Sequence, residues 1–308
     1  MSIADESGPT PRLDQAVRGL QALLEHPHLS GEYVRFRIDL LKAQGALCRV
    51  LDARAPSAAG AAPPRVAPPG AAQARRPALN AEAVTFDTAL LVRLALAIRD
   101  ALRQGGRQSA EAERLCAAGQ NDAGLLAEVA RCAAFGGERP ALEGLARRAG
   151  VSVDALLFFG RALAAPFVAV AARRLAGTGC QAPAAEPSPG CPVCGSPPGL
   201  AELQRDGGRR VLHCGLCGST WFFSRLACPH CGCRERDNLA FLRVNDGDPR
   251  WIEACERCKR YVKTVDARRL PAGENVDAAV EEAATLHLDL LAEKEGYARG
   301  VPSVAPVW

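Results

Sequence analysis

Apolar residues in the first part of the chain recur with the period of an α-helix. Leucines and valines are spaced by three and four residues over 11–24 and, after a His-Pro-His break, over 32–51. The same spacing returns after Asp87 in TALLVRLALAIRDALRQ and stops at Gly105. Each segment thus has one apolar face, which predicts helices that pack against one another.

Shorter helical patterns follow, and the last of them is almost wholly apolar. The short ones cover 110–118, 123–134 and 140–149. A long apolar segment begins after Ser152, whose hydroxyl is suited to cap a helix start. Because Arg161 and Pro166 interrupt this segment, it is a poor membrane span and is predicted to be the buried helix of a bundle.

The helical period disappears after a Pro- and Gly-rich stretch at 178–190, which marks a domain boundary. Two pairs of short apolar runs then flank Asp-Gly turns, at 201–204 with 210–213 and at 240–244 with 251–254. Because Gly accepts positive φ, Asp-Gly between two such runs is a strong hairpin signal. The pattern therefore predicts two hairpins in the second part of the chain.

The chain closes with a helical pattern over 276–297. Val280, Leu290 and Leu291 fall on one predicted apolar face of this helix. His287 falls on the same face, so we expect it to be packed rather than catalytic.

Composition adds bounds on domain number and location. The chain has 308 residues, 48% of them hydrophobic, which favours about two domains with packed cores. It has no uninterrupted apolar run of the ~18 residues that a membrane helix needs. Its start, MSIADESGPTPRLDQ, is polar and acidic, unlike a signal peptide, so we expect a cytoplasmic protein without membrane insertion.

Residues 53–78 are rich in small residues and proline: 19 of these 26 residues are Ala, Pro or Gly. We expect this segment to form a long loop.

The 13 cysteines are the most informative residues, because nine of them fall between Cys191 and Cys258. Eight of these nine form four C-x-x-C pairs: Cys191 and Cys194, Cys214 and Cys217, Cys228 and Cys231, Cys255 and Cys258. A reducing cytoplasm keeps thiols free, so paired cysteines there indicate metal or redox chemistry. Four C-x-x-C copies disfavour a thioredoxin-like motif, which has one.

Spacing predicts that consecutive pairs share a site. Each of the two predicted hairpins lies between two pairs, so the unit of turn, hairpin and turn occurs twice. Two such turns bring four thiolates together, and four thiolates can form a tetrahedral S4 metal site. An interleaved arrangement, with Cys214 and Cys217 joined to Cys228 and Cys231, is the alternative. Spacing does not distinguish iron from zinc, since both accept four thiolates.

Small S4 modules usually need their metal to fold. Substitution of Cys194 is therefore expected to unfold the C-terminal part and leave the helical domain folded.

Eight cysteines complete two sites, so His213 and His230 are not needed as ligands. Of the remaining cysteines, Cys48, Cys116 and Cys132 lie on predicted helices and are expected to be small core residues, and Cys180 lies in the linker. Cys233 is expected to be incidental, with a thiol that supports the ligands or is oxidised as the alternative.

Charge raises one further possibility, binding of nucleic acid. Residues 205–270 contain 14 Arg and Lys and 8 Asp and Glu, a net charge of +6. Zinc ribbons with a basic face can bind nucleic acid. Here the acids are interleaved with the bases and aromatic residues are few, so we expect no nucleic-acid partner.

The motifs resemble those of the formate dehydrogenase accessory protein family (FdhE). The resemblance lies in CPVCGSPP, CGLCGSTW, CPHCG and CERCKRY in this order, followed by ATLHLDLLAEKEGY. It implies a cytoplasmic factor needed for active respiratory formate dehydrogenase, acting on the molybdenum- or tungsten-containing catalytic subunit before export. It also implies metal binding by the eight paired cysteines, with rubredoxin-like iron favoured over zinc.

Together these observations predict an α+β protein. An all-helical N-terminal domain (1–178) precedes two tandem rubredoxin-like or zinc-ribbon modules (179–226 and 227–272) and a C-terminal helix and tail (273–308). We expect two metal ions, no enzymatic activity, and the formate dehydrogenase catalytic subunit as partner; self-association stays open. The alternatives are a rubredoxin-like electron-transfer protein and a zinc-ribbon nucleic-acid binder.

Overall fold

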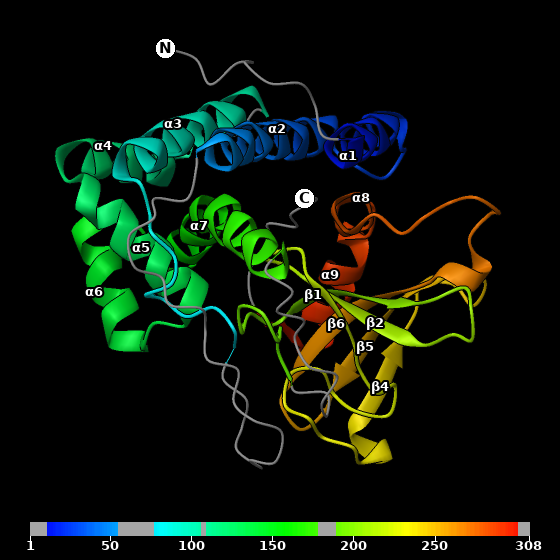
Figure 1. Ribbon diagram of the computed structural model, residues 1–308. Helices are drawn as coiled ribbons and strands as arrows, with labels where there is room; N and C mark the ends of the chain where they lie inside the picture. Colours follow the sequence, from blue (N-terminus) through cyan, green and yellow to red (C-terminus); the bar gives the residue numbers. More distant parts are fainter. Residues whose placement is uncertain (1–10, 55–76, 106–108, 178–188, 301–308) are drawn as a thin grey trace.

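The computed structural model describes residues 11–54, 77–105, 109–177 and 189–300 (Figure 1). Helices occupy the described chain up to residue 177 and strands follow, as the pattern predicts. The helices of the first part are α1 (Pro11–Ala22), the short 3-10 turn η1 (Leu23–Glu25), α2 (Gly31–Ala53), α3 (Thr88–Gln104), α4 (Ala110–Asn121), α5 (Ala123–Phe135), α6 (Arg139–Ala149) and α7 (Val153–Gly177). Most of the expected loop at 53–78 lies outside the described residues, and so does Cys180.

Short polar side chains define where several of these helices begin. Ser152 Oγ accepts a hydrogen bond from Ala155 N at 3.2 Å at the start of α7, which confirms the predicted cap. Asp87 plays the same part for α3, where its carboxylate accepts from Leu90 N at 3.0 Å. Because four N–H groups at a helix start lack partners inside the helix, these caps fix the boundaries locally.

Helix α7 runs through the centre of the bundle. By length and composition Val153–Ala176 could cross a membrane, but 78% of its most apolar window is buried inside the protein, which is typical of a core helix. Pro166 has no N–H, so the carbonyl of Ala162 lacks its helical partner. The side chain of Gln44, fully buried on α2, donates to this carbonyl at 2.8 Å. The sequence predicts a helix that continues past Pro166, and the structure confirms it, with Gln44 of α2 donating to the carbonyl that Pro166 leaves without a helical partner.

The strands form one mixed sheet in the order β3-β2-β1-β6-β5-β4. They are β1 (Pro198–Leu203), β2 (Arg210–Cys214), β3 (Thr220–Phe222), β4 (Leu239–Leu242), β5 (Arg250–Cys255) and β6 (Arg260–Asp266), with the short β7 (Ala298–Arg299) also on β6. Both predicted hairpins are present, as β1 with β2 and β4 with β5. Each gains a third strand, β3 or β6, after its second C-x-x-C pair.

The two three-stranded units are joined edge to edge. Strand β1 pairs with β6 in parallel, from Leu200 opposite Lys263 to Leu203 opposite Asp266. The tandem units therefore share backbone hydrogen bonds and one continuous sheet. Short 3-10 turns η2 (Arg236–Asn238) and η3 (Ala267–Arg269) precede β4 and follow β6.

The C-terminal helix differs from the prediction. It is two helices, α8 (Ala278–Ala284) and α9 (Leu286–Lys294), separated at Thr285, whose hydroxyl donates to the carbonyl of Glu281 at 2.6 Å. Beyond Thr285 the buried residues are Leu288 and Ala292, whereas His287 is exposed and Leu290 is 61% exposed. The expectation that His287 and Leu290 lie on a packed face was wrong, because α9 packs on the sheet through Leu288 and Ala292 instead.

The two short helices connect the sheet to the bundle. Leu288 and Ala292 of α9 share a core with Ile252 and Tyr261 of the sheet. Ala279 and Ala283 of α8 belong instead to a core with the apolar face of α1 and the start of α2. Figure 1 shows α8 lying between α1 and the sheet. The first helix, α1, is thus packed against α8, the helix before the last of the described chain.

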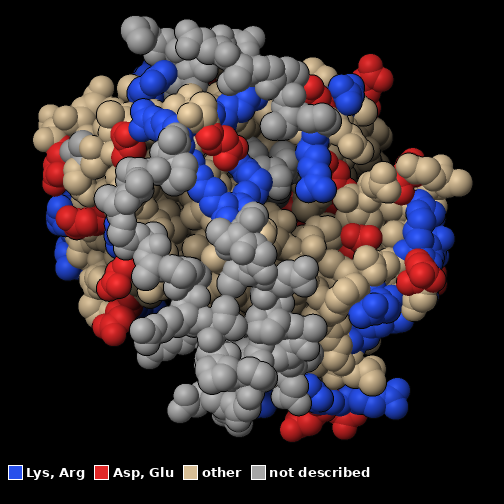
Figure 2. Space-filling view, viewed as in Figure 1, with Lys and Arg blue, Asp and Glu red and all other residues tan. Residues whose placement is uncertain are grey.

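Charge is mixed over the surface. On the face drawn in Figure 2, basic and acidic side chains of the described residues are interspersed over both the helices and the sheet. Many form exposed ion pairs, such as Arg148 with Glu128 at 2.5 Å, which contribute little to stability. The described part of this face therefore carries no extended surface of one sign.

Candidate metal centres

The C-x-x-C pairs occupy four turns of one design. In three of them the N–H of the first cysteine donates to the carbonyl five residues later at 2.8 Å: Cys191 to Ser196, Cys214 to Ser219, and Cys228 to Cys233. The residue after the second cysteine has positive φ in all four turns: Gly195 (77°), Gly218 (76°), Gly232 (73°) and Lys259 (54°). Glycine accepts this conformation without cost, so three turns use the residue that the geometry favours.

The first centre combines the turns that flank the first hairpin. The sulfurs of Cys191, Cys194, Cys214 and Cys217 all lie within 4.8 Å of one another. Cys191 Sγ is 3.6 Å from Cys217 Sγ, and Cys194 Sγ is 3.5 Å from Cys214 Sγ. All four side chains are buried.

The second centre combines the turns that flank the second hairpin. The sulfurs of Cys228, Cys231, Cys255 and Cys258 also lie within 4.8 Å of one another. The Cys228–Cys258 and Cys231–Cys255 sulfur distances are 3.7 and 3.8 Å. Cys231 is exposed and Cys258 is partly exposed, so this centre faces solvent. The grouping agrees with consecutive pairing and not with the interleaved alternative.

Both clusters have the dimensions of a tetrahedral metal site. A metal–sulfur bond of about 2.3 Å gives an edge of about 3.8 Å between sulfurs in a tetrahedron. Backbone N–H groups also point at the sulfurs, as Leu216 N and Cys217 N do toward Cys214 Sγ, each at 3.4 Å. Such donors stabilise thiolate charge. Each cluster can therefore hold one ion, and the distances suit iron and zinc equally.

The first cluster is embedded in the core of the helical bundle. Its four cysteines and Leu216 belong to one apolar cluster with residues of α2 to α7. The segment before α3 also reaches it, since Leu79 N donates to the carbonyl of Val193 at 2.7 Å. Arg161 of α7, 1% exposed, donates to Ser196 Oγ at 3.0 Å beside this cluster. Burial lowers the pKa of the Arg161 guanidinium, and the charge of Cys214 and Cys194 opposes that shift.

The second cluster has a separate and smaller environment. Cys228, Cys233 and Cys255 form an apolar cluster with only Leu239 and Cys258 packed against it. The fifth thiol, Cys233, holds the place that Ser196 and Ser219 hold in the first two turns, where its carbonyl closes the turn. This position gives Cys233 a backbone role that a serine fills elsewhere in the same chain.

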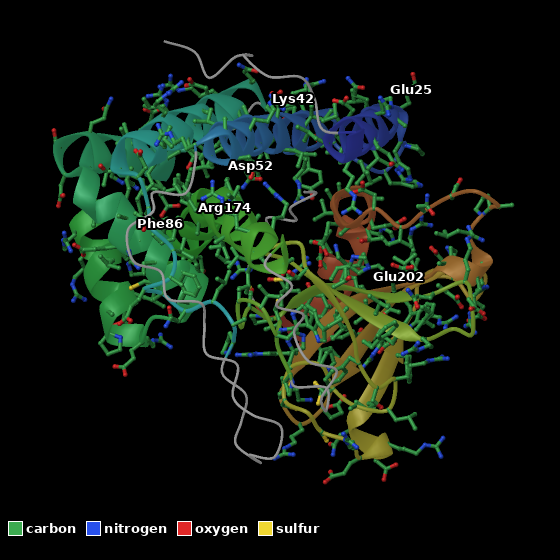
Figure 3. All side chains as sticks on the ribbon, in the orientation of Figure 1. Glu25, Lys42, Asp52, Phe86, Arg174 and Glu202 are labelled. Atoms are coloured by element: carbon green, nitrogen blue, oxygen red, sulfur yellow. The ribbon has the colours of Figure 1, made fainter. Side chains whose placement is uncertain are left out.

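The histidines near the clusters bond elsewhere. His213 Nε2 lies 2.9 Å from Oε2 of Glu202, the residue labelled in Figure 3. His230 Nε2 lies 2.9 Å from the carbonyl of Tyr261, and burial lowers the pKa of this imidazole to about 4. Neither belongs to the groups of four ligands.

Two of the cysteines outside the clusters are core residues, as expected. Cys48 and Cys116 are 5% and 3% exposed, and burial raises the pKa of their thiols to about 12 and about 11. Cys132 is partly buried and packs against the same bundle core. Their raised pKa values keep the Cys48 and Cys116 thiols protonated and unreactive.

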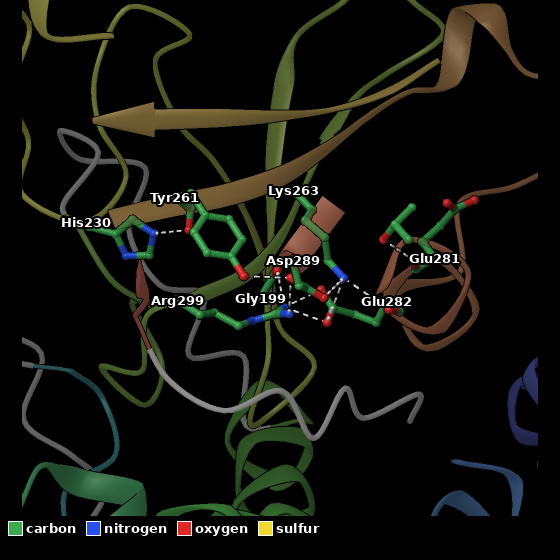
Figure 4. A network of polar contacts seen from close by, with 9 residues as sticks. Gly199, His230, Tyr261, Lys263, Glu281, Glu282, Asp289 and Arg299 are labelled. Carbon is green, nitrogen blue, oxygen red and sulfur yellow. Dashed lines mark hydrogen bonds and ion pairs between the residues drawn. The ribbon is translucent and has the colours of Figure 1, made fainter. Parts of the chain in front are cut away.

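A buried polar network lies between the sheet and the C-terminal helices (Figure 4). Lys263 Nζ is 2.8 Å from Asp289 Oδ2, and the hydroxyl of Tyr261 donates to the same carboxylate at 2.7 Å. Arg299 binds Asp289 at 3.0 Å and Glu282 at 2.5 Å. The network ties β6, β7, α8 and α9 together. Asp289 is the member of the C-terminal motif that takes part in this network, and its contacts fix α9 on the sheet.

Reasoning from the sequence gave Arg161 no role beyond interrupting an apolar segment, and it did not identify the polar network. A signal was present for Arg161, because it is a charged residue inside the apolar run FFGRALAAPF. Such a residue on a buried helix needs a polar partner. Its partner, Ser196, is 35 residues away, so the sequence could not name it.

Comparison with known proteins points to one family. The model described as "FdhE, central domain" matches residues 190–225, and "FdhE, C-terminal domain" matches residues 226–305. A protein named "Protein FdhE homolog" from Stutzerimonas stutzeri is 39% identical over 119 residues, 37% of each chain. Its namesake from Pseudomonas aeruginosa is 36% identical over 124 residues, 37% of this chain and 38% of that one. The matched region thus spans little more than a third of these relatives.

A solved structure extends the likeness to the helices. The crystal structure of the FdhE protein from Pseudomonas aeruginosa has a TM-score of 0.58 and 26% sequence identity, and the match covers 97% of this chain and 98% of that one. The two matched domains contain the two cysteine clusters, and the fold agrees over almost the whole length. The chain is thus similar to FdhE proteins in sequence over residues 190–305 and in fold over almost its whole length.

Proposed function

We propose that this protein is a cytoplasmic accessory factor for the maturation of a respiratory formate dehydrogenase, and that it binds the catalytic subunit before export. The observation that carries the proposal is the coincidence of the two family domains, over 190–305, with a continuous sheet that bears both cysteine clusters. The family resemblance supplies the identity of the partner. The protein acts by binding and has no turnover of its own.

We further propose that the eight paired cysteines ligate two metal ions, with iron favoured and zinc the alternative. Either ion, if bound at these sites, would cross-link two C-x-x-C turns. Iron would in addition allow a one-electron change of oxidation state. The chain contributes the pre-formed turns, the N–H donors to sulfur and the buried surroundings of the first cluster. Metal analysis with a visible spectrum of anaerobically purified protein tests this proposal. Two ions per chain are expected, and fewer would contradict it.

The partner is tested by affinity capture. The full chain, immobilised through a C-terminal tag, is mixed with the purified catalytic subunit of a formate dehydrogenase from the same organism. Specific retention is expected, and an unrelated exported molybdoenzyme serves as control. A deletion strain should lose formate oxidation and recover it with the wild-type chain. No retention together with normal formate oxidation would contradict the proposal.

The exposure of the second cluster favours one alternative function, electron transfer. Cys231 is exposed and Cys258 partly exposed, so a redox partner could approach an iron ion there closely. Reversible bleaching of the visible bands by dithionite would support this alternative. Protein that is colourless and contains only zinc would exclude it.

The nucleic-acid alternative has weaker support. Its motivation is the net charge of +6 over residues 205–270. Binding of this kind must weaken steeply with salt. Absence of any shift of a DNA or RNA duplex at low ionic strength would remove it.

A further inference from the structure

The starting observation is a fully buried arginine beside the first cluster. Arg161 lies in the middle of α7, among apolar residues, and is 1% exposed. Its Nη2 donates to Ser196 Oγ at 3.0 Å, and Ser196 is itself 3% exposed. The carbonyl of Ser196 accepts from Cys191 N at 2.8 Å, so the arginine bonds to the turn that presents the first ligand pair.

Charge explains why an arginine is placed there. Four thiolates around a divalent ion carry a net charge of about −2, and an isolated charge in an apolar core is strongly unfavourable. The four cysteines of the first cluster are buried in the same core as α7. Arginine stays protonated in proteins, so Arg161 is a fixed positive charge in that core.

The second cluster does not require the same arrangement. Its Cys231 is exposed, so water can screen the charge of a bound ion. Arg210 is the buried arginine beside this cluster: it pairs with Glu253 and donates to the carbonyl of Ala227, the residue before Cys228, at 2.6 Å.

We propose that Arg161 is the internal counter-charge of the first metal centre, so that metal binding in the sheet and docking of α7 stabilise each other. The inference rests on the proposed metal binding by Cys191, Cys194, Cys214 and Cys217. In this arrangement the helical bundle is part of the metal site, because it supplies the charge that makes a buried tetrathiolate stable. Arg161 is a positioning residue that acts through the thiolates and does not ligate the metal.

The test measures Co²⁺ affinity of the first site alone. The full chain carries Cys231→Ser and Cys258→Ser, which disable the second site, and is titrated anaerobically with Co²⁺ against a competing chelator. The thiolate-to-cobalt absorption reports occupancy. Arg161→Met should weaken binding at least tenfold, in the range seen when groups supporting metal ligands are removed. Arg161→Lys, which keeps the charge, should recover most of the loss.

A matched control uses another arginine of the same helix. Arg173 bonds to Asp52 at 2.6 Å, and Arg173→Met should leave Co²⁺ affinity unchanged. Folding is checked by circular dichroism of each variant. If Arg161→Met does not fold, Ser196→Ala replaces it as the test variant. Loss of the hydrogen bond between Arg161 and Ser196 should weaken Co²⁺ binding about threefold.

The outcomes separate the inference from the function on which it rests. Equal Co²⁺ affinity of the parent chain and a folded Arg161→Met chain would overturn the inference, and so would equal losses in the Met and Lys variants. Unchanged affinity of Ser196→Ala would overturn it where Arg161→Met is unfolded. Failure of the parent chain to bind Co²⁺ would instead overturn the first metal centre itself, and the inference with it.

Discussion

At the scale of single residues, the fourth C-x-x-C turn is the exception among four similar turns. The position after its second cysteine has φ 54°, yet it is occupied by Lys259 where the other turns have glycine. A side chain in the left-handed region is strained by contact between Cβ and the backbone. The turn keeps this geometry because Lys259 N donates to the carbonyl of Cys255 at 2.8 Å.

We therefore predict that Lys259→Gly stabilises the protein by about 1 kcal/mol, because glycine has no Cβ to strain. The measurement is the free energy of unfolding of the metal-loaded chain by denaturant. Lys259→Ala is the matched control, since it also removes the ion pair with Glu256 but keeps the Cβ. A gain as large in the alanine variant as in the glycine variant would show that backbone strain is not the cause.

At the scale of elements, α2 and α7 depend on each other through one freed carbonyl. Pro166 removes the donor for Ala162, and Gln44 replaces it. At the other end of this contact Arg174 donates to the carbonyl of Leu51 at 2.6 Å, close to Asp52 (Figure 3). A cation in the last turn of α7 thus satisfies a carbonyl in the last turn of α2.

Substitution of Gln44 by Met is predicted to destabilise the protein by about 1–3 kcal/mol, the cost of a buried carbonyl left without a donor. The same substitution should cost less in a Pro166→Ala chain, where the backbone N–H gained at that position can bond to the carbonyl of Ala162. A double-mutant cycle by thermal or denaturant unfolding measures the coupling. Additive effects would contradict the role assigned to Gln44.

At the scale of the whole molecule, the two clusters differ in their surroundings. The first is buried in the bundle core, and the second lies in a small cluster with Cys231 at the surface. Sequence gives no hint of this difference, because the two units have the same motif and nearly the same length.

Chelation should therefore remove the ion of the second centre first. With excess chelator, we expect iodoacetamide to modify Cys231 and Cys258 well before Cys191 and Cys217, because exposed sulfurs are accessible to both reagents. Mass spectrometry of the peptides over time follows the order, and total metal is measured in parallel. Modification of both sets at one rate would contradict the assignment.

The structure also changes what a ligand substitution should do. Since the first cluster shares the bundle core, Cys194→Ser is now expected to lose one ion and to destabilise the helices as well as the sheet. Cys258→Ser, in the exposed centre, should lose one ion and leave the thermal midpoint of the helical signal almost unchanged. Circular dichroism with metal analysis distinguishes the two. A helical signal that melts identically in both variants would refute this coupling.

The local features of this protein can be read from its sequence. Helix positions, both hairpins and the grouping of eight cysteines follow from periodicity, turn residues and spacing, which act over a few residues. The family likeness also lies in such short motifs. The helix 276–297 was the exception, since it is divided at Thr285 and its two parts pack on different partners, α8 on α1 and α9 on the sheet.

How these features are joined depends on contacts between residues far apart in the chain. The parallel pairing of β1 with β6 makes one sheet of two units, and the bundle core is continuous with the first cluster and not with the second. The contacts of Arg161 with Ser196 and of Gln44 with Ala162 span 35 and 118 residues. Which buried polar groups become hydrogen-bond partners depends on how the folded chain brings them together. Spacing along the sequence does not predict these partners.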